Sequence, residues 1–191
     1  MTATVLVQSS FIALAIVATV PRSDRAAAQD TFPDIRAVVE FQRAADAYAF
    51  LHRQAERRLG QEHRKAGRPV DSIESAELAT AIINARSMAA PGLLFTPSVA
   101  ALFRPVAARA ARAPGCDAGE LRTGVWDLSH EVNSTATGTR PLAACIATAL
   151  PALPEELEYR TAGTVLAVVD SHANLVVDIL PALLAGSDLR R

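Results

Sequence analysis

The hydrophobic pattern of this chain changes its period once, close to Pro154. Before that residue, apolar side chains recur at every third or fourth position, which is typical of helices with one buried face. After it, the period is two or the residues are almost all apolar, which predicts three strands: 157–161, 165–169 and 175–180. We therefore predict an α+β fold in which about four to five helices, within 31–150, pack on a small antiparallel β-meander, within 155–181.

Two helices are predicted in the first half of the chain. The stronger spans 30–59, where a single apolar stripe contains Val38, Phe41, Ala45, Tyr48, His52, Ala55 and Leu59. Gly60 is expected to end this helix because glycine is a poor helix former, and 61–68 is expected to be a charged linker. A second helix is expected to begin at Asp71, with Glu74 completing a capping pair.

A third helix is predicted to begin at Thr96, which can cap it, with Pro97 at the first helical position. Pro105 should kink or split this helix, because proline removes a backbone hydrogen bond and crowds the preceding turn. Further along, we expect short helices over 117–121, 126–130 and 141–150, and the piece most prone to disorder at 133–139.

The first 28 residues are predicted to be a signal peptide. An unbroken apolar run, 11–20, is followed by a polar segment and by small residues that fit a signal peptidase site, Ala26 and Ala28. Cleavage after Ala28 would leave 29–191 as a single domain, long enough to bury a core of its own. The alternative is an uncleaved membrane anchor, which needs about 20 apolar residues. We expect a periplasmic or secreted protein without a membrane segment after cleavage.

Charge and cysteine usage narrow the partners and the compartment. The formal net charge is −1 and no basic face is evident, so nucleic acid is not an expected partner. The two cysteines, Cys116 and Cys145, are predicted to form a disulfide, as an even pair does in an oxidising compartment. Closing a loop of about 30 residues would stabilise the fold by roughly 3–4 kcal/mol. Two buried thiols or a redox pair are the alternatives, although a C-x-x-C spacing is absent.

The best candidate for chemistry is the turn between the last two predicted strands. It holds Asp170, His172 and Asn174, and Asp178 follows along the strand. A carboxylate two residues from an imidazole can orient a general base or supply metal ligands. The simpler interpretation, which we favour, is that Asp170 and Asn174 hydrogen-bond their own backbone to shape the turn. Asp170, His172 and Asp178 are therefore weak catalytic candidates, and no metal or cofactor is expected.

The other histidines and acidic residues give weaker signals. His130 precedes Glu131 but lacks the HExxH continuation, because residue 134 is serine. His52 lies on the apolar stripe and is expected to be a core histidine with one satisfied nitrogen, while His63 is expected to be exposed. The glutamates at 155, 156 and 158 are expected to be solvated. The sequence contains no nucleophile elbow and no glycine-rich phosphate loop.

The C-terminal part of the chain resembles a group of secreted bacterial proteins with no assigned activity. The resemblance is carried by LPEELEYR at 153–160 and DSHANLVVDILP at 170–181. The segment FTPSVAALF, 95–103, is similar to the start of that group's central helix. The resemblance implies an exported envelope or periplasmic protein and carries over no activity or site.

Two hypotheses of function follow. The favoured one is a non-catalytic exported domain that binds an envelope protein or a small ligand. If the strand 157–161 lies at an open edge, it could accept a partner strand. The alternative is a small hydrolase or metal-dependent enzyme that uses His172 with Asp170 or Asp178, and His130 as a further candidate. It requires another histidine or acidic side chain, from outside the turn, within roughly 8 Å of His172, since ligands and relay partners must nearly touch. Failing that condition would end the hypothesis, whereas a pocket that unites these groups would reverse the ranking.

Overall fold

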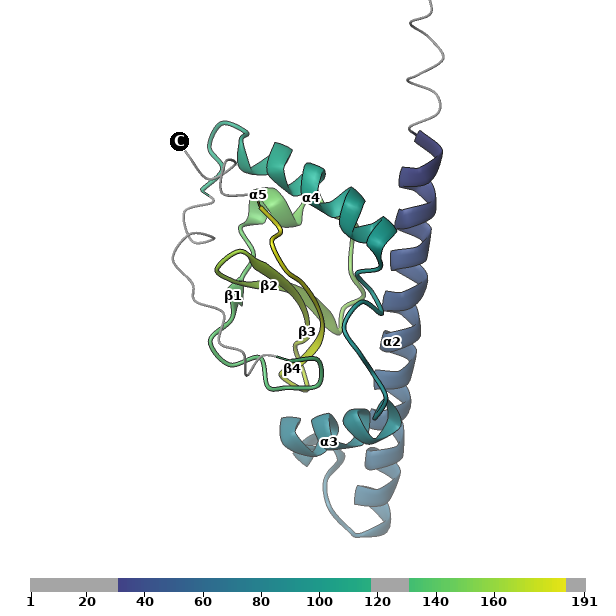
Figure 1. Cartoon of the computed structure of the whole chain (residues 1–191). Coiled ribbons are helices and arrows are strands. Elements are labelled where there is room, and N and C mark those ends of the chain that lie inside the picture. Colours follow the sequence, from purple (N-terminus) through teal and green to yellow (C-terminus); the bar gives the residue numbers. More distant parts are fainter. Residues whose placement is uncertain (1–30, 118–130, 185–191) are drawn as a thin grey trace, which may run out of the picture.

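The longest element, α2, stands along one side of the molecule with a four-stranded sheet beside it (Figure 1). α4 packs against the N-terminal half of α2 and α3 against its C-terminal half. The computed structural model describes residues 31–117 and 131–184. The helices are α2 (Thr31–Lys65), α3 (Ser75–Ala85), α4 (Pro97–Ala111) and α5 (Ala144–Ala147), with the 3-10 helix η1 (Val70–Ser72) before α3. The predicted α+β fold is confirmed.

The sheet contains the predicted meander and one further short strand. Its order is β1-β2-β3-β4 and all neighbours are antiparallel. The strands are β1 (Arg140–Pro141), β2 (Leu157–Ala162), β3 (Val165–Asp170) and β4 (Leu175–Leu180). The condition for adding a partner strand at 157–161, an open edge, is not met, because β1 pairs with Arg160 and Thr161 and the Leu142 amide bonds to the Tyr159 carbonyl. Most of β2 is therefore closed to a partner strand.

α2 continues past the residue that was predicted to end it. Gly60 is buried inside the helix, which runs on to Lys65, so most of the predicted charged linker is helical. A helical glycine costs about 1 kcal/mol relative to alanine, so surrounding contacts must outweigh its propensity. One contact is visible: a side chain at residue 60 would place its Cβ atom 3.3 Å from Cγ1 of Val70. Glycine here lets η1 pack close to α2.

Of the N-caps predicted for α3 and α4, only that of α4 is confirmed. The N-cap of α4 is Thr96, whose Oγ1 accepts a hydrogen bond from the Val99 amide, as predicted. α3 begins later than predicted, at Ser75, and its N-cap Glu74 makes no side-chain capping bond. α4 is not split at Pro105, because buried residues on both sides of the proline, including Phe103 and Ala107, hold the helix against the core.

An aromatic cluster joins α2, α4 and β2 in the core. Phe41 of α2 lies 4.9 Å from Phe103 of α4 and 6.3 Å from Tyr159 of β2, measured between ring centroids. Phe95 completes the cluster at 6.0 Å from Phe41. The predicted stripe on α2 is confirmed, since its members from Phe41 to Leu59 are buried. This packing sets the position of α2 against the sheet, and therefore also the positions of the α2 side chains that face the sheet.

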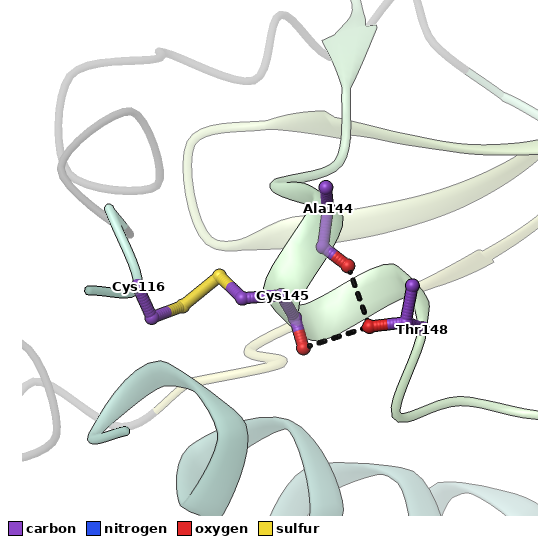
Figure 2. The surroundings of a disulfide bond; sticks show 4 residues. All are labelled: Cys116, Ala144, Cys145 and Thr148. Atoms are coloured by element: carbon purple, nitrogen blue, oxygen red, sulfur yellow. Dashed lines mark hydrogen bonds between the residues drawn. A yellow bond between two sulfur atoms is a disulfide. The ribbon is translucent and has the colours of Figure 1, made fainter. Parts of the chain in front are cut away.

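The predicted disulfide is present between Cys116 and Cys145 and links the chain after α4 to α5 (Figure 2). α5 is shorter than the predicted helix over 141–150, and its end is held by Thr148 Oγ1, which donates to the Ala144 carbonyl oxygen at 2.8 Å.

The segment 133–139 is ordered, contrary to the prediction, because its backbone bonds to β4 at Val176 and to Asn174. The predicted helices near 117–121 and 126–130 fall almost entirely outside the described residues, and His130 does so too. Within the described ranges, no helix is both long and apolar enough to cross a bilayer.

Candidate functional site

Side chains from α2 and from the β3–β4 turn meet in one polar cluster. His52 and Glu56 come from α2, and Asp170 and His172 come from the end of β3 and the turn that follows. His172 Nδ1 lies 3.5 Å from Glu56 Oε1, and the His52 and His172 rings meet edge to face with centroids 5.2 Å apart. The condition set for the enzymatic hypothesis, a second histidine or acidic group from outside the turn near His172, is therefore met.

Helical spacing and turn chemistry together produce this meeting. His52 and Glu56 are four residues apart, so they lie on the same face of α2, and this is the face that packs on the sheet. At the end of β3, Asp170 Oδ1 accepts hydrogen bonds from the amides of His172 (3.0 Å) and Ala173 (2.8 Å). The predicted role of Asp170 in shaping its own turn is confirmed, and this role holds His172 in place beside α2.

The second carboxylate oxygen of Asp170 fixes the orientation of His52. Asp170 Oδ2 lies 2.6 Å from His52 Nδ1 and accepts a hydrogen bond from the Tyr48 hydroxyl at 2.9 Å. Asp170 and His52 both have 0% of their surface exposed. Because a carboxylate can only accept, His52 carries its proton on Nδ1, and in the neutral ring Nε2 has a free lone pair.

In this buried group, Asp170 and His52 each stabilise the charged form of the other. Burial alone would raise the pKa of Asp170, but hydrogen bonds from His52, from the Ala173 amide and from Tyr48 outweigh it and lower that pKa. Burial alone would lower the pKa of His52, but the hydrogen bond and charge of Asp170, with the charge of Glu56, raise it. Burial and the adjacent Asp170 carboxylate raise the pKa of Tyr48, so its hydroxyl stays a donor.

Arg86 supplies a positive charge on the other side of Tyr48. Its guanidinium lies 5.1 Å from the centroid of the Tyr48 ring and donates to the Val177 carbonyl oxygen at 2.9 Å. Burial lowers the pKa of Arg86, and the nearby Asp178 and Asp170 act against this shift. The cation therefore helps to offset the buried negative charge of Asp170 without touching His52 or His172 among the contacts described.

The free nitrogen of His52 is the unusual feature of the cluster. His52 Nε2 is buried and lies 3.1 Å from Glu56 Oε1, yet no hydrogen bond of acceptable geometry forms to it within the described residues. Buried polar atoms nearly always have a partner, and those without one call for an explanation, such as a role in binding an ion. This nitrogen lies close to the same carboxylate oxygen that His172 Nδ1 approaches.

These three residues have the chemistry and spacing of a metal site. One ligand atom from each of His52, Glu56 and His172 can be chosen so that all lie within 4.8 Å of one another. Around a tetrahedral ion with bonds of about 2.0–2.1 Å, neighbouring ligand atoms are about 3.3 Å apart. The separations from Glu56 Oε1, 3.1 Å to His52 Nε2 and 3.5 Å to His172 Nδ1, bracket that value. Asp170 then occupies the position of the carboxylate that orients a metal-binding histidine from behind.

A groove opens beside the cluster. A cavity of about 540 Å³ lies between the C-terminal half of α2 and the segment that joins it to α3. Glu56 and His172 form part of its wall, and their side chains are 41% and 52% exposed, in contrast to the buried His52. The cluster is thus closed on the His52 side and accessible on the side of the groove. A cavity of this size can take a small organic molecule.

The remaining candidates from the sequence have structural roles. Asp178 points to the loop before α4, where its carboxylate accepts backbone N–H bonds from Gly92, Leu94 and Phe95 at 2.6–2.9 Å. The expectation that His63 is exposed is wrong: it is 0% exposed and bonds to Glu77 and the Pro69 carbonyl.

One of the glutamates expected to be solvated is also buried. Glu156 is 2% exposed and pairs with Arg53 of α2, and this ion pair accompanies its burial beside the helix. Neither Asp178 nor Glu156 belongs to the candidate metal group.

Sequence reasoning found one side of the cluster and missed the other. The turn residues Asp170 and His172 were candidates, while His52 was assigned to the core and Glu56 was not considered. The expectation of a buried His52 with one bonded nitrogen is confirmed, but its second nitrogen is what defines the site. A histidine and a glutamate four residues apart on a buried helical face was the available signal. Comparison of the chain with protein-family models, curated proteins and solved structures gives no match.

Proposed function

We propose that this protein binds a divalent transition-metal ion of the zinc type through His52 Nε2, the Glu56 carboxylate and His172 Nδ1, and that it acts as a metal-dependent hydrolase. The observation that carries the proposal is the buried, unbonded Nε2 of His52, held toward Glu56 and His172 by Asp170. Two imidazoles and one carboxylate are a common ligand set of catalytic zinc. The proposal reverses the ranking favoured from sequence, in which a non-catalytic binding domain came first.

A simple ion pair between His52 and Glu56 is the competing explanation of the short contact. It predicts an N–H directed at the carboxylate oxygen, which the geometry does not provide. It also gives no reason for a second imidazole, that of His172, to approach the same oxygen. A shared ion accounts for both contacts at once.

Three protein ligands leave a coordination position for water or substrate, and such open positions distinguish catalytic from structural zinc sites. The ion would supply Lewis acidity and a reactive water at neutral pH. In hydrolysis, a water oxygen forms the new bond to an acyl or phosphoryl atom, the bond to the leaving oxygen breaks, and a water proton passes to the leaving group. The chain's own contribution is to orient His52 through Asp170 and Tyr48 and to keep the other two ligands open to the groove.

We further propose that the protein works outside the cytosol, in the periplasm or as a secreted protein. The apolar leader with its Ala26 and Ala28 site supports this, as does the disulfide between Cys116 and Cys145. Disulfides persist in oxidising compartments and are rare in the cytosol.

The metal site is tested by titrating the purified, metal-stripped chain with Zn²⁺ and Co²⁺ in competition with a chelator. We expect one ion per chain, and at least a 10-fold loss of affinity in each of His52→Gln, Glu56→Gln and His172→Gln. His63→Gln is the matched control, since it removes an equally buried histidine on the same helix. Unchanged affinity in the three variants, or no binding by the wild type, would overturn the site.

Hydrolysis is tested separately on 4-nitrophenyl acetate and 4-nitrophenyl phosphate. We expect zinc-loaded wild type to release 4-nitrophenol and His172→Gln to lose this activity, while His63→Gln keeps it. A chain that binds one zinc ion but turns over neither ester would overturn the hydrolytic assignment and leave metal binding alone.

A further inference from the structure

We propose that the groove beside the metal ligands binds the anionic group of a small amphipathic substrate through Arg57 and Arg64. This inference rests on the proposed function, because the groove is taken as the place where the substrate meets the ion. The shared chemistry is an oxyanion, either a phosphate or a carboxylate, attached to an apolar body.

Two arginines of α2 line the groove at positions that repeat along the helix. Arg57 directly follows the ligand Glu56, and Arg64 lies seven residues further, on the same helical face. Gly60 lies between them and also lines the groove. The wall of the groove on α2 is therefore basic, and it begins at the metal cluster.

Gly60 makes room for one of these cations. A Cβ atom added at Gly60 would lie 3.7 Å from Nη1 of Arg64 and 3.3 Å from Cγ1 of Val70. The guanidinium of Arg64 thus lies over the glycine, at the wall of the groove. This placement gives the glycine, unfavourable inside a helix, a reason to be there.

Neither groove arginine has its charge satisfied within the described part of the chain. No ion pair forms to Arg57 or Arg64 in residues 31–117 and 131–184, whereas Arg53 pairs with Glu156 and Arg58 with Glu62. Asp71, on the opposite wall, is the one other acidic residue lining the groove besides the ligand Glu56. With a divalent ion bound, the groove carries an excess of positive charge, which favours an anionic ligand.

The opposite wall is suited to an apolar body. Val70, Ile73 and Leu78 line the groove from η1, the segment after it and α3. A volume of about 540 Å³ accommodates a small molecule but not a folded partner. A ligand with its anionic group at the arginines and its apolar part against this wall would lie beside His172 and Glu56.

The test is calorimetric binding of phenyl phosphate, benzoate and the neutral benzyl alcohol to zinc-loaded protein. We expect Arg64→Gln and Arg57→Gln each to weaken binding of the anions by about 10-fold, as for loss of one charge-assisted hydrogen bond, and to leave benzyl alcohol unaffected. Arg58→Gln is the matched control, because it removes the same charge from the next residue of the helix and lies outside the groove. Gly60→Ala should also weaken anion binding without changing any charge, since its Cβ crowds Arg64.

The outcomes separate this inference from the proposed function. If phenyl phosphate alone responds to the arginine changes, the substrate group is a phosphate; if benzoate alone responds, it is a carboxylate. Normal zinc binding with anion affinities that are the same in wild type, Arg57→Gln and Arg64→Gln would overturn the groove and spare the metal site. If the chain binds no zinc but still binds anions in a way that depends on the arginines, the metal site is overturned and the anion-binding groove is kept.

Discussion

α2 buries two histidines about three turns apart, and they differ in one respect that decides their roles. His63 has acceptors at both ring nitrogens: the Pro69 carbonyl oxygen at 3.2 Å from Nδ1 and the Glu77 carboxylate at 2.9 Å from Nε2. His52 has Asp170 at Nδ1 and no hydrogen bond at Nε2 within the described residues. Burial alone therefore does not identify a functional histidine; the state of its second nitrogen does.

The surroundings of the two histidines agree with this difference. His63 bonds to residues that follow it closely in sequence, in the connection from α2 to α3, so its network ties a local turn together. His52 bonds to a carboxylate 118 residues away, at the end of β3, and its second nitrogen lies beside Glu56 without a hydrogen bond. When both ring nitrogens of a histidine are hydrogen-bonded, neither is available to a ligand. A histidine with one unbonded nitrogen can bind a ligand there.

The largest expected effect comes from removing the carboxylate that orients His52. Asp170→Ala leaves His52, Tyr48 and two turn amides without a buried partner, so we expect a loss of about 3–5 kcal/mol in the free energy of unfolding. Zinc affinity should fall about 10–100-fold, because the second-shell carboxylate is lost. Urea unfolding and zinc titration measure the two effects.

Asp178→Ala is the control for this change. It also removes a buried carboxylate that holds several backbone amides, so it should destabilise the fold by a few kcal/mol. Because Asp178 makes no contact with the metal ligands, zinc affinity should stay at the wild-type value. Equal zinc affinities in the two variants would show that Asp170 acts only through stability and would remove the distinction drawn between His52 and His63.

The next effect is stabilisation by the ion itself. At a free zinc concentration about 100 times the dissociation constant, the folded state gains about 2.7 kcal/mol, provided the unfolded chain does not bind. We expect scanning calorimetry to show a rise of several degrees in the melting temperature of the wild type and of His63→Gln. His52→Gln should show no rise, and a zinc-dependent rise in that variant would place the ion elsewhere.

The fold was largely predictable because it depends on periodicity, and periodicity is local. The stripe from Phe41 to Leu59 and the three strands of the meander follow from spacings of three to four and of two. The helix end predicted at Gly60 and a split at Pro105 are both absent for a common reason. Propensity amounts to about 1 kcal/mol for glycine and 3 kcal/mol for proline, and packing of both flanks outweighs it.

The site was half predictable. Turn chemistry marked Asp170 and His172, but His52 occupies a position of the core stripe, where pattern alone cannot tell a packed imidazole from a ligand. The distinction depends on which residue of the distant sheet meets Nδ1, and this is set by the docking of α2 through Phe41, Phe103 and Tyr159. Sequence spacing contains no information on that docking.

A smaller effect is expected from the tyrosine above Asp170. Tyr48→Phe removes one hydroxyl that donates to a buried carboxylate, so the fold should lose about 1 kcal/mol. Tyr159→Phe removes a similar bond, to the Pro151 carbonyl oxygen, and should cost about as much. Zinc titration separates the pair: only Tyr48→Phe should lower affinity, by a few-fold, since only Tyr48 contacts the carboxylate that holds His52.

The smallest effect concerns the other histidine and is seen in the pH dependence of stability. The hydrogen bond from His63 is the main reason that the pKa of Glu77 lies below its ordinary value of 4.5, with the charges of His63 and Arg68 adding to it. A carboxylate with a lowered folded-state pKa stabilises the fold above that ordinary value, and the contribution disappears as the pH falls through the folded-state pKa. Wild type should therefore be more stable than Glu77→Gln at neutral pH, and the stabilities of the two should converge below pH 4.5 in urea titrations.

Zinc affinity at neutral pH should be the same in both, because both ring nitrogens of His63 have partners without an ion. A zinc affinity that depends on Glu77 would mean that the two histidine networks are coupled along α2. The site could then not be assigned to the His52 network alone.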